Sequence, residues 1–278
     1  MQYAFFDVHS HLHDKAFSAD QDTLIEQMRV GGVGTILVGT DQEESSLAVK
    51  LAEQHDHLFA TVGLHPADTI TEVFDTGFYE GLAQSPKVVA IGECGLDYHY
   101  IENFFDKDMK EKGLVWTKEE EKERQKKIFQ EQISLAVKLN KPLMLHGRPS
   151  KKSMDAYEDM LEMLEEAKKG NETLRGNAHF FVGNIDIAKR FLDIGFTMSF
   201  PGVITFTHDY DDVVRYVPLT MMHAETDSPY ATPAPFRGQR NSSLFVQEIV
   251  AKIAVLREQP FEEVRLQLLL NAKRVFGV

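Results

Sequence analysis

The stretch Tyr3-Ala4-Phe5-Phe6-Asp7-Val8-His9-Ser10-His11 is an apolar run followed at once by two histidines. Such a run is typical of a buried strand, in which successive side chains alternate between the two faces. His9 and His11 therefore point the same way at the end of the predicted strand, with Asp7 one step behind. Two imidazoles that project together can supply two ligands of a metal site. A pair of surface histidines fits this short segment equally well, so the choice between the two interpretations depends on the rest of the chain.

Short apolar runs alternate with amphipathic stretches along the whole chain, a pattern that indicates βα units and a parallel sheet. We predict eight strands: Ala4–Val8, Thr35–Val38, Leu58–Val62, Val88–Ile91, Leu143–Leu145, Asn177–Phe180, Thr197–Ser199 and Met221–Ala224. Because no glycine-rich phosphate turn follows the first strand, the pattern favours an α/β fold of the (β/α)8 TIM barrel type over a doubly wound sheet. A last helix, Phe261–Phe276, is expected to pack outside the closed ring. We see no linker, and we expect one domain over residues 1–278.

The composition limits the class of protein. Hydrophobic residues make up 43% and charged residues 26% of the 278 residues, as in an ordinary soluble globular protein. The sequence has no secretory leader pattern and no apolar run of membrane-spanning length, so we expect a cytoplasmic protein with no membrane partner. The single cysteine, Cys94, fits a reducing compartment. A net charge of −13 argues against a protein that coats long nucleic acids, although bound cations attract phosphate locally.

One segment departs from the average composition. Residues Tyr100–Arg124 are rich in Lys, Glu and Asp. Such a charge run is usually a solvated loop, and here it leads into a helix that Thr117 and Glu120 can begin with a capping box. The connection is long for a barrel loop and follows the fourth strand. We therefore expect it at the mouth of any site there, where it narrows access.

In a (β/α)8 barrel the reactive groups lie at the carboxyl ends of the strands. Seven polar side chains of this chain fall at such ends: His9, His11, His65, Glu93, His146, His179 and Asp227. A lone histidine beside an apolar run is more often a core or rim residue, but so many at one end are hard to obtain by chance. Mixed imidazole and carboxylate ligands suit Zn²⁺, Mn²⁺, Fe²⁺ or Co²⁺, whereas pure oxygen cages suit Mg²⁺. Six candidate ligands are more than one tetrahedral ion needs, so two ions bridged by a carboxylate are predicted.

These motifs make the chain resemble the TatD-like metal-dependent deoxyribonucleases, a branch of the amidohydrolase superfamily of (β/α)8 barrels. The resemblance runs nearly end to end. It rests on Asp-x-His-x-His at 7–11, Gly-x-His-Pro at 63–66, Gly-Glu-x-Gly-Leu-Asp-Tyr at 92–98, His146 with Arg148, His-x-Phe-x-Gly at 179–183, Glu-Thr-Asp-Ser-Pro at 225–229, and Pro235, Arg237, Gly238 and Asn241.

The resemblance implies roles for individual residues. One divalent ion is expected among His9, His11, Glu93 and Asp227, and a second among Glu93, His146 and His179. Zinc, manganese and magnesium all stay open as the metal. Asp227 is the expected general base and Glu93 the bridging carboxylate of the reaction. Arg148 and Arg237 are candidates for phosphate contact, with structural ion pairs as the alternative. His65 is expected either to orient substrate or to hydrogen-bond a ligand from behind.

The resemblance implies hydrolysis of phosphodiester bonds by metal-activated water, with DNA ends or short nucleotides as substrate. Three departures weaken the substrate assignment: no acidic residue follows Arg148, the Tyr100–Arg124 connection is long, and the net charge is acidic. The alternative is a small-molecule amidohydrolase or phosphoesterase on the same barrel. Related two-ion hydrolases often carry a carboxylated lysine where this chain has Glu93, which weakens that alternative. A third hypothesis, a non-catalytic metal-binding or scaffold protein, is disfavoured by the complete ligand set and the candidate base. The oligomeric state stays open.

Overall fold

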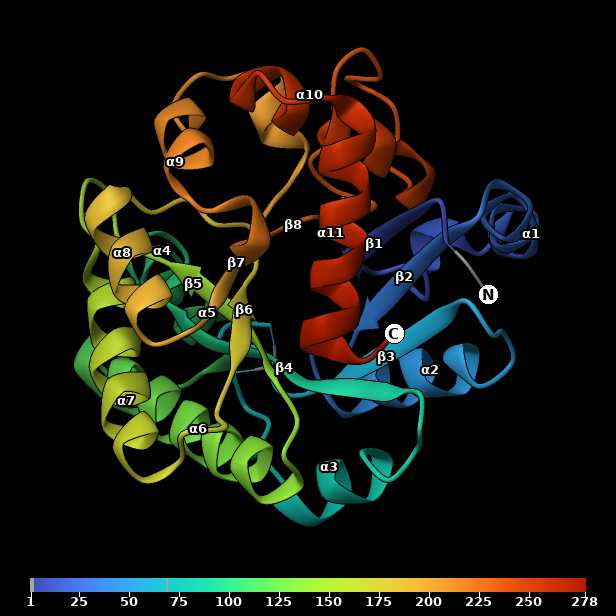
Figure 1. Ribbon diagram of the computed structural model, residues 1–278. Helices are drawn as coiled ribbons and strands as arrows, with labels where there is room; N and C mark the ends of the chain where they lie inside the picture. The colour runs from blue at the N-terminus through green and yellow to red at the C-terminus, as the bar shows by residue number, and fades with distance from the viewer. Residues whose placement is uncertain (1–2, 69) are drawn as a thin grey trace.

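A computed structural model describes residues 3–68 and 70–278 and shows eight parallel strands in one sheet (Figure 1). Each strand pairs with its neighbours in sequence, in the order β1 to β8. The strands are β1 (Phe5–Ser10), β2 (Val33–Val38), β3 (Leu58–Val62), β4 (Val88–Asp97), β5 (Leu143–Arg148), β6 (Gly176–Ala178), β7 (Thr197–Phe200) and β8 (Met222–Ala224). The predicted barrel is confirmed. The strands β4 and β5 run further than predicted, as far as Asp97 and Arg148.

Helices surround the strands (Figure 1). They are α1 (Gln21–Gly31), α2 (Gln42–Ala52), α3 (Thr76–Leu82), α4 (Tyr98–Asn103), α5 (Phe105–Lys112), α6 (Lys118–Leu139), α7 (Asp155–Gly170), α8 (Ile185–Asp193), α9 (Asp211–Tyr216), α10 (Val246–Arg257) and α11 (Phe261–Phe276). All six residues of β2 and all ten of β4 are buried, since helices cover one face and the barrel interior the other. None of the helices in the described part of the chain is both long and apolar enough to cross a membrane.

The ring of strands has a seam between β8 and β1. Over the described residues these two strands form no ladder, and one isolated bridge joins Ser10 to Ser228. At the carboxyl end of the strands, the amide of Asp227 donates to the carbonyl of His9 (2.9 Å) and the amide of His11 donates to that of Ser228 (2.8 Å). These bonds close the seam at the end where the predicted ligands lie.

The last helix closes the opposite end of the seam. On α11, Asn271 donates to the carbonyl of Met222 at the start of β8 (2.7 Å), and Arg265 donates to that of Ala4 just before β1 (2.6 Å). Its apolar side chains join a cluster with alternate side chains of β1 and β2: Phe6, Val8, Ile36, Val38, Leu269, Ala272, Val275 and Phe276. The helix has the predicted bounds and lies outside the ring of strands, where it covers one end of the barrel at the seam (Figure 1).

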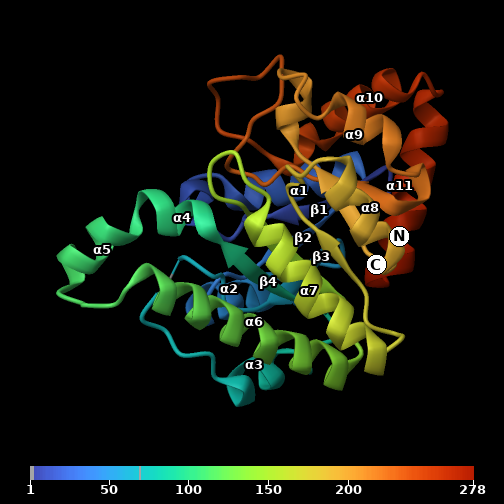
Figure 2. The ribbon, with the colours of Figure 1, turned by 90° about the vertical axis from the view of Figure 1, so that its left-hand side faces the viewer.

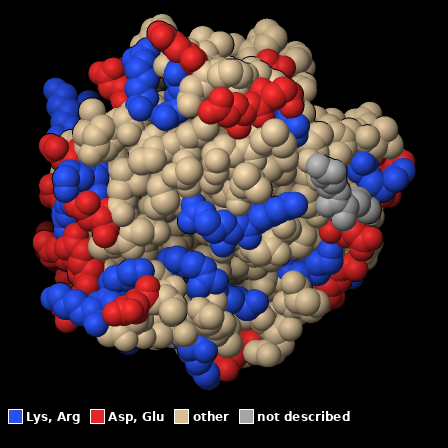
Figure 3. All heavy atoms as spheres, viewed as in Figure 1, with Lys and Arg blue, Asp and Glu red and all other residues tan. Residues whose placement is uncertain are grey.

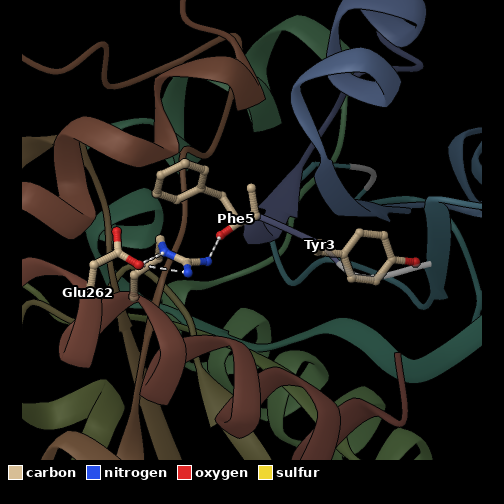
Figure 4. Close-up of a pocket in the computed structure, with 5 residues that line it drawn as sticks. Tyr3, Phe5 and Glu262 are labelled. Atoms are coloured by element: carbon tan, nitrogen blue, oxygen red, sulfur yellow. Dashed lines mark hydrogen bonds and ion pairs between the residues drawn. The ribbon is translucent and has the colours of Figure 1, made fainter.

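Within the described part of the chain, no group of histidine and acidic residues that could hold a metal ion lies beside α11. Figure 3 shows the same face as Figure 1, with charges of both signs around its edge and basic side chains across its middle. A hollow of about 440 Å³ lies beside Tyr3, Phe5 and Glu262 (Figure 4). Glu262 forms an ion pair there with the guanidinium of Arg265 at 2.8 Å. This end of the barrel therefore serves to hold the strands together.

The segment Tyr100–Arg124 corrects one expectation. It is not a solvated loop, because α4, α5 and the first turns of α6 occupy most of it. Phe105 and Met109, one helical turn apart, are buried and fix α5 to the barrel. The predicted capping box of Thr117 and Glu120 at the start of α6 is confirmed. Figure 2 shows α4 and α5 extending at the end of the barrel away from α11.

Candidate metal centre

The predicted ligands meet at the carboxyl ends of the strands, on the floor of a cavity of about 990 Å³. His9 lies one residue before the end of β1, below the cavity surface, and Glu93 and His146 lie on β4 and β5. His179 directly follows β6. The members that line the cavity are His11, His65, Glu93, His146, His179 and Asp227. The structure thus brings together side chains that are up to 218 positions apart, from His9 to Asp227.

A first group of candidate ligands comprises His9, His11 and Glu93. Nε2 of His9 lies 3.3 Å from Nε2 of His11 and 3.4 Å from Oε2 of Glu93. Asp227 lies beside this group, with its Oδ1 3.4 Å from Nε2 of His11 and 3.7 Å from Nε2 of His9. Two ring nitrogens and two carboxylate oxygens therefore face one another within a few ångströms.

A second group comprises Glu93, His146 and His179. Oε1 of Glu93 lies 2.7 Å from Nδ1 of His146 and 2.9 Å from Nε2 of His179. Glu93 is buried and belongs to both groups, with one carboxylate oxygen toward each. This is the arrangement that a bridging carboxylate requires.

The pKa shifts of the buried residues favour binding of a cation next to Glu93. Burial and the neighbouring His179 lower the pKa of His9 to about 4, so this imidazole is neutral at pH 7. Although burial alone would raise it, the pKa of Glu93 lies well below its usual value because His179 and His9 adjoin it. Burial opposes charge on His146 too, but hydrogen bonds to Asp97 and Glu93 raise its pKa to about 9.

These observations test whether the residues fit a metal. The donors that converge are imidazole nitrogens and carboxylate oxygens, which is the ligand chemistry of zinc and related divalent ions. His9 is neutral, as a ligand must be, and its ring stacks on that of His179 with centroids 3.7 Å apart. Although burial lowers it, the adjoining Glu93 and Glu225 raise the pKa of His179 well above its usual value, so a metal ion bound at this ring would displace its proton. The residues therefore fit divalent metal.

Two buried carboxylates behind the histidines were missed from the sequence. Oδ2 of Asp97 lies 3.1 Å from Nε2 of His146. Oε1 of Glu225 lies 3.3 Å from Nδ1 of His179 and accepts the amide of Phe180 at 2.6 Å. A carboxylate on the second nitrogen of a ligating histidine fixes the ring and its tautomer. The signal was present, since both acids fall inside the quoted motifs at 92–98 and 225–229.

Asp7 lies behind the first group and contacts Thr226, the residue before Asp227. Its carboxylate accepts the amide of Thr226 at 2.8 Å and the hydroxyl of Thr226 at 2.6 Å, and it faces the amide of His9 at 3.3 Å. It thereby ties β1 to the segment that carries Asp227. The backbone of Asp227 has a φ of 52°, a conformation that costs a residue with a side chain free energy and is common at functional sites.

The three predicted substrate-binding residues are placed differently. His65 lines the cavity, with Nε2 3.7 Å from Oε1 of Glu93 and Nδ1 2.9 Å from Oδ1 of Asp68. Arg148 lines the cavity and is exposed. Arg237 is not among the lining residues described. Its guanidinium lies 3.9 Å over the ring of Phe206 and donates to the carbonyl of Thr232, so its phosphate contact stays a prediction.

The chain is similar to known proteins over nearly its full length. The sequence family described as "TatD related DNase" matches residues 6–277. The uncharacterized metal-dependent hydrolase YabD of Bacillus subtilis (strain 168) is 36% identical over 278 residues, or 98% of this chain and 99% of that protein. YjjV, a TatD homologue from Escherichia coli K12, has a crystal structure that matches with a TM-score of 0.82 and 26% identity, covering 100% of both chains. A TatD family hydrolase from Entamoeba histolytica shares the fold, with a TM-score of 0.82, 19% identity and 99% of each chain covered.

Proposed function

Because this chain belongs to the TatD-related DNase family of metal-dependent hydrolases, we propose that it cleaves phosphodiester bonds of DNA ends or short oligonucleotides in the cavity above Glu93. The observation that carries the proposal is the pair of ligand groups that share Glu93, on the floor of a cavity of about 990 Å³. A cavity of this size accommodates a nucleotide, since small-molecule sites occupy about 300–1,000 Å³.

Two divalent ions are proposed at this floor, with Asp227 completing the first group. When bound, such a pair would activate the attacking water and offset the charge on the phosphoryl oxygens. Glu93 would hold both, and His146 and His179 are oriented for ligation by Asp97 and Glu225. Zinc and manganese suit the nitrogen-rich set, and magnesium stays among the candidates.

Asp227 is proposed to take the proton of the attacking water. Its carboxylate lines the cavity beside His11, and the hydrogen bond from its amide to His9 fixes its position over the floor. Asp7 reinforces that position through Thr226. A base held in place within reach of the nucleophile accelerates a reaction by about 10²–10⁴-fold.

Arg148 and His65 are proposed to contact the substrate. Both line the cavity, and a planar guanidinium can donate two parallel hydrogen bonds to phosphate oxygens. His65 faces Glu93 from one side, with its other nitrogen beside Asp68. It can thus donate to an oxygen of a substrate that lies over Glu93.

The test begins with metal analysis of protein purified without chelator, where we expect close to two divalent ions per chain. Turnover of single-stranded and duplex DNA is then compared with turnover of an amide and lactone panel, with Mn²⁺ or Mg²⁺ added. DNA cleavage that chelator abolishes supports the proposal. Cleavage of an amide or lactone with intact DNA would assign the small-molecule alternative instead. No turnover by fully metallated protein would favour a non-catalytic role.

A further inference from the structure

The cavity has walls of opposite charge. Carboxylates line it on the side of the segments after β1, β2 and β3: Asp14, Asp41, Glu44 and Asp68. Among the described residues, every lysine and arginine that lines it comes from one segment, the last residue of β5 and the loop that leads to α7, which we call the 148–153 loop. Those cations are Arg148, Lys151 and Lys152, and all three are exposed. An anionic chain that rises from the floor is therefore repelled by one wall and attracted by the other.

These three cations are available to a ligand. Within residues 3–68 and 70–278, none of them forms an ion pair, although the chain carries 43 acidic and 30 basic residues. Many other cations of the surface are paired, as Lys126 is with Asp159 at 2.9 Å. The three side chains are thus free to bind an anion beside the cavity in which the proposed function places the scissile phosphate.

Two carboxylates hold the backbone of the 148–153 loop in place without forming ion pairs with the three cations. Asp155 accepts the amide of Ser150 at 3.0 Å and also its hydroxyl, and Asp155 donates its own amide to Ser153 at 3.0 Å. Glu102 of α4 accepts the amide of Lys151 at 2.8 Å. Since the backbone is already ordered, a ligand has to order the ends of the lysine side chains and little else.

The cations also lie in sequence outward from the floor. Arg148 follows His146 by two residues on β5, which places both on one face of the strand about 7 Å apart. Lys151 and Lys152 come after the end of the strand. Positive charge therefore begins beside the candidate ligands and continues along the part of the cavity wall that the 148–153 loop forms.

We propose that Lys151 and Lys152 bind the phosphate next to the scissile one, and that the enzyme prefers strands with at least two phosphates over a single phosphodiester. The inference rests on the proposed function, because it takes the scissile phosphate to lie over Glu93. Arg148, nearer the floor, is left to the scissile phosphate itself. The preference follows from the position of the lysines, which a substrate with one phosphate on the floor does not reach.

The test compares the Lys151→Gln/Lys152→Gln variant with a control variant, Lys127→Gln/Lys273→Gln. The control removes the same charge from exposed lysines that neither line the cavity nor form an ion pair in the described part of the chain. The substrates are a thymidine dinucleotide with one phosphodiester and a thymidine decanucleotide, both with Mn²⁺. Binding of a fluorescent decanucleotide in chelator, followed by anisotropy, gives a readout that does not depend on turnover.

We expect the Lys151/Lys152 variant to lower the ratio of kcat/KM for decanucleotide over dinucleotide at least tenfold. Its dissociation constant should also depend less steeply on salt, with a slope of log Kd against log salt reduced by about 0.7, the value for one phosphate of a single strand. The control variant should keep both the ratio and the slope. Lys151→Arg/Lys152→Arg, which preserves the charge, should keep most of the preference.

Each other outcome overturns the inference. An equal effect of both glutamine variants would mean that only overall charge matters. An equal loss for both substrates would place the lysines at the scissile phosphate. Wild-type protein that cleaves both substrates without preference would refute the second phosphate site alone. Wild-type protein that cleaves neither substrate would refute the proposed function together with this site.

Discussion

Replacement of Glu93 by Gln should remove metal from both candidate positions at once. The side chain keeps its size, but one of its two oxygens becomes an NH₂ group, which is a donor and cannot ligate. The oxygens of Glu93 now lie 2.7 Å from His146, 2.9 Å from His179 and 3.4 Å from His9. In either orientation of the amide, its NH₂ group faces one of the two candidate metal positions and cannot ligate there. The negative charge that favours a cation is lost at both positions.

A matched variant, Glu225→Gln, sets a lower limit for the loss of metal affinity expected of Glu93→Gln. Glu225→Gln leaves the side chains of both ligand groups in place and weakens the contact behind His179, together with the hydrogen bonds that Glu225 accepts from Phe180 and Ser199, so it should cost about 10–100-fold in affinity for the second ion. Glu93→Gln removes a ligand itself and should cost more than that at both positions. Bound metal should therefore fall from about two ions to well below one per chain. His146→Ala should empty mainly the second position.

Elemental analysis and calorimetric titration with Zn²⁺ or Mn²⁺ measure both quantities, and circular dichroism checks that the variants fold. Two ions bound by Glu93→Gln with affinity equal to that of the wild type would refute the bridging role. Loss of a single ion would show that Glu93 belongs to one position only.

Three further predictions follow from other residues. Asp227→Asn should lower kcat on DNA by about 10²–10⁴-fold with metal content measured in the same sample, and near wild-type turnover by fully metallated protein would show that another group is the base. Phe104, 49% exposed at the cavity edge, offers its ring to a base, so Phe104→Ala should raise KM for single-stranded oligonucleotides about 5–100-fold; an unchanged KM would exclude stacking there. Burial, with Arg274 nearby, lowers the pKa of His223 from 6.5 to about 3. As the pH falls from 7.5 to 5, His223 therefore binds a proton in the unfolded chain but not in the folded one. This difference should lower the free energy of unfolding by about 2 kcal/mol. Urea unfolding should show that His223→Gln lacks this part of the loss, and equal losses in both proteins would contradict it.

The class of fold and the set of candidate ligands follow from local patterns of the sequence. Alternation of apolar runs with amphipathic stretches is a local property, and so are the ends of strands such as the one before His9. Because all strands of a parallel barrel share one direction, residues at their carboxyl ends must meet, whatever the details of packing. That rule places Glu93 with His146 and His179 from their positions in the chain alone. One domain over residues 1–278 and metal binding by these side chains stay predictions.

The groups that contact those side chains, and the walls of the cavity above them, depend on packing between segments that are distant in the sequence. Asp97 faces His146 because of the register between the neighbouring strands β4 and β5, and Glu225 faces His179 although β7 lies between their strands; local patterns fix neither placement. The charged segment after β4 folds into helices because Phe105 and Met109 find apolar partners on the barrel, and propensity alone could not reveal those partners. The 148–153 loop becomes the basic wall of a cavity only when distant loops bring carboxylates to the opposite side. Contacts between segments far apart in sequence depend on how the whole chain packs, and for that reason they were absent from its local pattern.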